Sequence, residues 1–264
     1  YTDILREGYE NGWIDVVANA NKRSGAYSWG AYGTHPYVLL NQQDDLDSMF
    51  TLAHEMGHAI HTYYSDKTQP YRYSGYLIFV AEVASTCNEC LLNHYLLEHE
   101  TEAKNRNYIL NHYLENFRTT LFRQTMFAEF EKIVHEKTAL GESLTKDELN
   151  KIYHDLNVRY YGPDVVVDNE IDYEWMRIPH FYTAFYVYQY ATGFSAAVAF
   201  SKKILEEGQP AVDRYVKEFL SGGCSKDPID LLAAAGVDMS TPHPVEDALS
   251  VFAKYLDEFE KQMA

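Results

Sequence analysis

The chain has 264 residues, and 46% of them are hydrophobic, which is enough for a buried core in one large domain or two small ones. Its 39 acidic and 22 basic residues give a net charge of −17 at pH 7. Because such a surface repels phosphate backbones and anionic lipid, neither nucleic acid nor a membrane is expected as a partner.

Most of the chain shows apolar residues at every third or fourth position, in segments separated by strong helix breakers, and this pattern predicts a mainly α-helical fold. We expect helices near residues 3–20, 45–65, 76–99, 102–139, 145–160, 181–207, 210–220, 228–235 and 244–262. No linker, low-complexity tract or internal repeat stands out, so a single domain over residues 1–264 is expected.

The N-terminal residues contain no basic segment followed by an apolar one, so no secretory signal is visible. They also lack a starting Met, and we therefore expect the chain to be a fragment of a longer protein.

Residues 25–41 differ from the helical segments, because Gly, aromatic and β-branched residues alternate there with turn residues. This pattern predicts a small β-sheet. An edge strand near residues 37–41, beginning at Tyr37, could pair with the backbone of an extended peptide. His35 precedes Pro36 and could contact the same peptide, with a role in a turn as the equal alternative.

The run His54-Glu55-Met56-Gly57-His58 lies inside the helix expected over residues 45–65. Two His four residues apart project from one helix face about one turn apart, so both imidazoles can reach one ion. A catalytic zinc ion takes three protein ligands and keeps one open position for water. The alternative is a chance match in a helix that binds no metal.

The downstream candidates for a third ligand are Glu82, Glu89, His61 and His94. His61 lies about two turns from His54, too far to share one ion with it. Glu82 lies in an apolar helical run, where an isolated carboxylate is costly to bury without a cation. Glu89 follows on the same face and is placed to orient a ligating His. The sequence therefore predicts one Zn²⁺ per chain, bound by His54, His58 and Glu82.

The three Cys, at positions 87, 90 and 224, are too few and too unevenly placed for a disulfide framework. They favour a reducing compartment, and we expect a cytoplasmic location. Cys87 and Cys90 have the spacing of a redox motif, but they lie inside an expected helix with no preceding strand, which disfavours a redox function.

Residues 178–201 contain no Asp, Glu, Lys or Arg and are about as long as a bilayer span. Pro179, His180, Gln189 and several Tyr and Thr residues make this stretch too polar for a lipid-facing helix. We expect a buried helix that lines a cleft, with some aromatic rings in the core and others facing a cavity.

Several segments together resemble the M3 family of oligopeptidases, and most of all its oligoendopeptidase F branch. The resemblance is carried by residues 22–27, 35–41, 50–61, 81–85 and 178–194. It implies a mostly helical, zincin-like fold whose active site lies in a channel that admits short unfolded peptides and excludes folded proteins. Because members of the family are longer, it also implies that this chain is the C-terminal catalytic part and that an N-terminal part is missing.

The resemblance also implies roles for single residues. His54 and His58 match the two His ligands of the family, Glu82 matches the third ligand, and Glu55 matches the general base. In the family, a His and one or two Tyr of the aromatic segment bind substrate and stabilise the oxyanion. The corresponding positions here are His180 and Tyr188 as catalytic residues and Tyr182 and Tyr186 as substrate-binding residues, which join His35 and Tyr37 from the expected strands.

The expected function is that of a zinc-dependent endopeptidase acting on short unfolded oligopeptides. Glu55 would take a proton from zinc-bound water and pass it to the leaving amine, while zinc and the Tyr188 phenol share the oxyanion. Two alternatives stay open. One is a helical zinc exopeptidase of the carboxypeptidase or peptidyl-dipeptidase type, and the other is a non-catalytic fragment that binds peptides.

Overall fold

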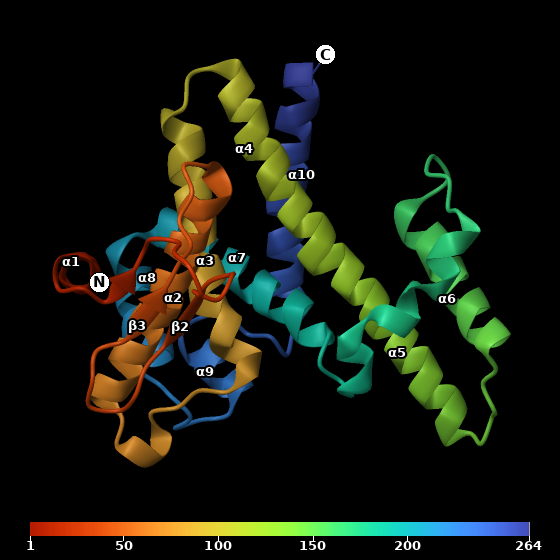
Figure 1. The fold of residues 1–264 in the computed structure, drawn as a ribbon, viewed down its shortest axis with the longest axis horizontal. Coiled ribbons are helices and arrows are strands. Elements are labelled where there is room, and N and C mark those ends of the chain that lie inside the picture. The colour runs from red at the N-terminus through yellow and green to blue at the C-terminus, as the bar shows by residue number, and fades with distance from the viewer. Residues whose placement is uncertain (264) are drawn as a thin grey trace. The chain divides into compact units, whose positions relative to one another are not determined.

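The structure, a computed structural model, describes residues 1–263 and confirms a mainly α-helical fold with one small β-sheet (Figure 1). The chain forms two compact units. The first comprises Tyr1–Tyr113 and Gly193–Ala264, and the second comprises Leu114–Thr192.

The first unit contains the sheet and the helices around it. Its strands are β1 (Ile14–Asp15), β2 (Tyr27–Trp29) and β3 (Tyr37–Leu39). Its helices are α1 (Thr2–Glu10), α2 (Leu46–Thr68), η1 (Tyr71–Tyr73), α3 (Ile78–His99), α8 (Gln209–Arg214), η5 (Tyr215–Leu220), α9 (Pro228–Ala234) and α10 (His243–Met263), with most of α4 (Ala103–Asn116) and α7 (Tyr188–Glu207).

The sheet has the strand order β1-β3-β2, with β1 parallel and β2 antiparallel to β3. The expected edge strand near residues 37–41 is therefore wrong, because β3 is the central strand and β2 lies at the edge. The cause lies earlier in the chain. The helix expected over residues 3–20 ends at Glu10, and after Gly12, whose φ of 71° suits glycine, the chain forms β1 and pairs with β3.

Helices α2 and α3 form the centre of the first unit and are packed closely against each other. A Cβ atom added at Gly57 would lie 2.6 Å from the Cα of Ser85, so only glycine at this position allows the approach. The Asn88 side-chain amide of α3 donates a hydrogen bond of 3.0 Å to the Ala53 carbonyl of α2, which is a second contact between the two helices. Apolar residues of α7, η5 and α9, such as Phe219, complete the core around them.

The second unit contains η2 (Phe117–Phe122), α5 (Arg123–Ala139), α6 (Lys146–Tyr161), η3 (Asn169–Arg177) and η4 (Pro179–Tyr182). Its α6 begins with a capping box between Thr145 and Glu148. In its core the Tyr153 hydroxyl donates a hydrogen bond of 2.7 Å to buried Glu174, which also forms an ion pair of 2.7 Å with Arg123.

The helix expected over residues 181–207 begins only at Tyr188. Phe185 has a φ of 59°, which no helix accommodates, and its backbone N–H donates a hydrogen bond of 2.8 Å to Glu131. This bend separates η4 from α7. Within residues 1–263, no helix has both the length and the apolar character that crossing a membrane requires.

Candidate metal centre

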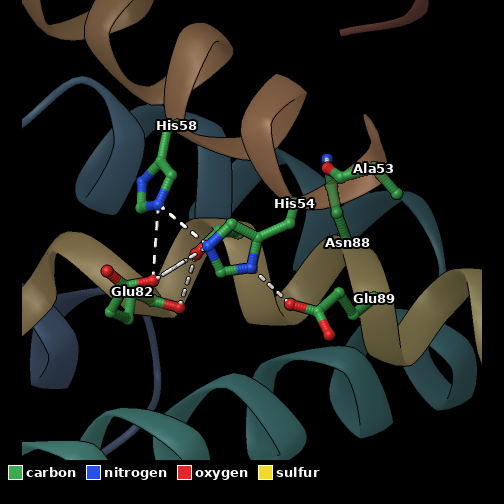
Figure 2. A network of polar contacts seen from close by, with 7 residues as sticks. Ala53, His54, His58, Glu82, Asn88 and Glu89 are labelled. Carbon is green, nitrogen blue, oxygen red and sulfur yellow. Dashed lines mark hydrogen bonds and ion pairs between the residues drawn. The ribbon is translucent and has the colours of Figure 1, made fainter. Parts of the chain in front are cut away.

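Helix α2 supplies two imidazoles to one point beside α3. The helix begins after Asp45, whose side chain accepts a hydrogen bond of 2.8 Å from the Ser48 backbone, and it continues unbroken through the His-containing run. His54 and His58 lie one turn apart on the face towards α3, with ring centroids 4.8 Å apart (Figure 2). The helical spacing expected from the sequence is therefore present.

Glu82 of α3 meets both imidazoles (Figure 2). Its Oε2 lies 3.1 Å from His54 Nε2 and 3.3 Å from His58 Nε2, and the two Nε2 atoms are 3.2 Å apart. Ligand atoms around a tetrahedral zinc ion, at bond lengths of about 2.0–2.1 Å, are separated by roughly 3.3 Å. The three atoms therefore fit a zinc ion. Within residues 1–263, no other group of three such side chains converges in this way.

Two further side chains hold the ligating groups in place. Glu89 Oε1 accepts a hydrogen bond from His54 Nδ1, which leaves His54 Nε2 facing the centre. The sequence predicted this orienting contact, and it is confirmed. The Ser85 hydroxyl donates a hydrogen bond of 3.1 Å to Glu82 Oε2 and restrains that carboxylate.

The electrostatics of the group favour a cation. Burial lowers the pKa of His54, but hydrogen bonds with the carboxylates of Glu82 and Glu89 outweigh burial and raise that pKa to about 10. Burial raises the pKa of Glu82, but hydrogen bonds from His54 and His58 lower it below its usual range. The two carboxylates thus stabilise positive charge at the point where the three ligand atoms meet.

Glu55 lies next to the group on α2 and is 7% exposed. Burial raises the pKa of its carboxyl, against the opposing effect of the neighbouring imidazoles and of the Ser28 backbone. A carboxylate whose pKa is closer to neutrality exchanges protons more readily with a reacting group at pH 7. Its position and its pKa suit a general base.

A cleft of about 1180 Å³ opens over His54, His58 and Glu82, the candidate metal group. Its walls are β2 with the residues that follow it, the cleft-facing side of α2, residues 71, 72 and 74–77, the first turns of α3, and Cys224. Asp66, Tyr32 and Tyr71 also line the cleft, and none of the three was predicted from the sequence. A signal for Asp66 was present, because positions 62 and 66 continue the four-residue spacing of His54 and His58.

His35 and Tyr37 are not among the described residues that line this cleft. The His35 ring is stacked on Trp13 at 5.5 Å between ring centroids, and its Nδ1 lies 2.6 Å from the Pro36 carbonyl oxygen. These contacts suit the alternative role in a turn, and substrate binding by His35 and Tyr37 stays a prediction.

The other predicted site residues belong to the second unit. The His180 ring is stacked on Tyr186 at 5.3 Å, and its Nε2 lies 3.2 Å from the Tyr190 hydroxyl. Tyr182 is 77% exposed, and Tyr188 begins α7. The catalytic and substrate-binding roles expected for these residues also stay predictions.

Comparisons with known proteins identify similar sequences over nearly the whole chain. The model of Peptidase family M3 matches residues 1–251. Oligopeptidase PepF of Bacillus subtilis is 58% identical over 261 residues, which are 99% of this chain and 39% of that protein. The chromosomal oligoendopeptidase F of Lactococcus lactis is 47% identical over 99% of this chain and 43% of that protein. The chain thus spans about two fifths of the length of these relatives.

Solved structures share the fold. A crystal structure of a protein from Chlamydophila abortus superposes with a TM-score of 0.91 and 42% sequence identity. The superposed region is 98% of this chain and 44% of the Chlamydophila chain. The crystal structure of oligoendopeptidase-F from Enterococcus faecium superposes with a TM-score of 0.75 and 47% sequence identity. The superposed region is 83% of this chain and 39% of the Enterococcus chain.

Proposed function

Because the chain belongs to peptidase family M3, we propose that it is the catalytic part of a zinc-dependent endopeptidase that hydrolyses short unfolded oligopeptides. The observation that carries the proposal is the convergence of His54 Nε2, His58 Nε2 and Glu82 Oε2 beside buried Glu55, inside a cleft. The names of the relatives, oligopeptidase and oligoendopeptidase, support the substrate class.

The proposed reaction assigns a task to each group. One zinc ion, bound by His54, His58 and Glu82, would supply Lewis-acid chemistry to water and to the scissile carbonyl. Glu55 accepts the proton of the attacking water and delivers it to the leaving amine. Glu89 keeps His54 in the orientation that binding requires.

The edge strand β2 is the proposed site for the substrate backbone, in place of the strand near residue 37. Among the described residues, β2 pairs with β3 alone, and it lines the cleft beside the metal group. An extended peptide added to such an edge forms backbone hydrogen bonds that do not depend on side-chain identity. Broad sequence tolerance follows.

The remaining expectations are part of the same proposal. His180 and Tyr188 would stabilise the oxyanion, and Tyr182 and Tyr186 would contact substrate. Both units would belong to one catalytic domain, which the family match over residues 1–251 supports. A longer protein would supply the missing channel wall, and the three free cysteines favour the cytoplasm.

Glu55→Gln tests the function directly, because it keeps the shape of the side chain and removes the base. We expect zinc content to stay at that of the wild type, measured by elemental analysis, while kcat for an internally quenched peptide falls by about 10²–10⁴-fold. Glu82→Ala should instead lose zinc. Glu98→Gln, on the exposed surface of α3, is the control that should change neither. Full activity in Glu55→Gln would remove Glu55 from its role.

The peptide in this assay is blocked at both ends, which separates the alternatives. An endopeptidase cuts it. An exopeptidase spares it and cuts the same peptide with free ends, whereas a non-catalytic fragment binds both peptides and cuts neither.

A further inference from the structure

Helix α2 extends the cleft well beyond the metal group. Thr62 and Asp66 follow His54 and His58 at intervals of four residues, and all four side chains line the cleft. Because a helix rises about 1.5 Å per residue, Asp66 lies roughly 12 Å along the axis from His58. The same helix therefore presents a metal site at one end of the cleft and a carboxylate at the other.

The Asp66 carboxylate has no ion-pair partner in the part of the chain that the structure describes. Arg72 also lines this end of the cleft, but its Nη2 donates a hydrogen bond of 2.7 Å to the Tyr73 hydroxyl, and its guanidinium lies 4.9 Å from the centre of that ring. Arg72 is thus held by Tyr73, and Asp66 is left to attract a cation from a ligand.

Aromatic rings lie at the same end of the cleft as this carboxylate. Tyr32 and Tyr71 pack edge to face with ring centroids 5.4 Å apart, and the Tyr32 hydroxyl donates a hydrogen bond of 3.1 Å to the Gln69 carbonyl. Tyr71 is nevertheless 77% exposed. Exposed phenol faces bind the aliphatic stem and the charged head of Lys or Arg, through apolar contact and cation–π attraction.

We propose that Asp66, with Tyr32 and Tyr71, recognises a Lys or Arg side chain of the bound peptide, three or four residues from the scissile bond. The spacing follows from the geometry, since an extended peptide advances about 3.3 Å per residue and needs three to four residues to cover roughly 12 Å. This inference rests on the proposed function, because the metal group fixes where the scissile bond lies.

The test uses a neutral internally quenched peptide, blocked at both ends. A single Lys is moved through four positions on each side of the cleaved bond, and Gln or Glu takes each position in matched peptides. At one position three or four residues from that bond, we expect kcat/KM to be about fivefold higher with Lys than with Gln.

Three variants assign the preference. Asp66→Asn should bring the Lys-to-Gln ratio of kcat/KM to about one, and Asp66→Glu, which keeps the charge, should retain most of it. Asp257→Asn changes the net charge equally on an exposed turn of α10 and should leave the ratio unchanged.

The results that would overturn the inference differ from the result that would overturn the proposed function. Equal cleavage of Lys and Gln peptides at every position, or a Lys preference that persists in Asp66→Asn, overturns the inference and leaves the peptidase function standing. A preference for Glu assigns this end of the cleft to Arg72 and also overturns the inference. If the wild type cuts none of the peptides, the proposed function itself fails and the inference fails with it.

Discussion

At the scale of single residues, the proposed metal centre depends on a side chain, Glu89, that is not itself a proposed ligand. His54 can turn about its own side-chain bonds, and Glu89 fixes it by accepting a hydrogen bond from Nδ1. This contact selects the tautomer whose Nε2 is free to bind, and it raises the basicity of the ring. We therefore expect the affinity for zinc to depend partly on the Glu89 carboxylate, which lies on the opposite side of the His54 ring from Nε2.

Glu89→Ala should weaken zinc binding by about 10–100-fold, because the His54 ring loses its fixed orientation. A competition titration against a chelator of known affinity measures this change. Glu98→Ala removes a carboxylate from the same helix, where it pairs with His94 at 3.2 Å, and should leave the affinity unchanged. An unchanged affinity in Glu89→Ala would mean that His54 is held by its packing alone.

His61 should make the stability of the chain depend on pH. It is 1% exposed beneath the Tyr76 ring, at 3.8 Å between ring centroids, and burial, with a smaller effect of His58, lowers its pKa to about 3. The unfolded chain keeps a pKa near ~6.5 at this residue and so binds more protons below that pH. Stability from neutral His61 is complete above pH ~6.5 and falls as the pH drops towards 3.

His61→Phe should remove this dependence while keeping the stacking on Tyr76. One titrating group changes the unfolding free energy by at most about 1.4 kcal/mol for each pH unit. Between pH 6.5 and 5 the wild type should therefore lose about 2 kcal/mol of unfolding free energy through His61. Urea unfolding of the metal-free protein at both values measures the loss, which the variant should lack. Equal pH dependence in the two proteins would show that His61 titrates normally.

At the scale of elements, the site exists because α2 and α3 approach each other closely at Gly57. Gly57→Ala would place a methyl group 2.6 Å from the Cα of Ser85 and must separate the helices. We expect a loss of about 1–3 kcal/mol in unfolding free energy, measured by urea unfolding, and weaker zinc binding, because the ligands lie on different helices.

A second helical glycine provides the matched control. A Cβ atom at Gly193 of α7 would lie 3.9 Å from the Phe79 carbonyl oxygen, an ordinary contact. Gly193→Ala should therefore be neutral or stabilising, since alanine favours a helix. If both variants behave alike, the close approach of α2 and α3 is not what Gly57 provides.

Helical periodicity predicted α2, α3, α6 and α10 to within a few residues, because it is a local property of the sequence. The same local geometry placed His54 and His58 together, and the cost of burying a carboxylate pointed to Glu82. Partners of strands are not local. The residues of β1 were expected to be helical, so β3 was predicted to be an edge strand although it is the central one. For the same reason the sequence did not predict that the edge strand β2 lines the cleft. Gly12 was a visible signal that the first helix ends before residue 20, whereas residues 181–187 contain no Gly or Pro that marks the bend at Phe185.

At the scale of the whole molecule, the proposed ion joins the two helices that form the centre of the first unit. Apolar packing and the hydrogen bond between Asn88 and Ala53 already hold α2 and α3 together. An ion with ligands on both helices binds the folded chain and finds no formed site in the unfolded one. Its binding energy therefore adds to the stability of the fold.

Removal of zinc should lower the unfolding temperature. An ion present at a thousand times its dissociation constant stabilises the folded state by about 4 kcal/mol, which corresponds to a shift of roughly 10 °C for a chain of this size. Calorimetry with and without a chelator measures the shift. In Glu82→Ala, which lacks a ligand, the chelator should have little effect. A wild type that contains zinc but unfolds at the same temperature after chelation would place its metal outside the α2–α3 pair.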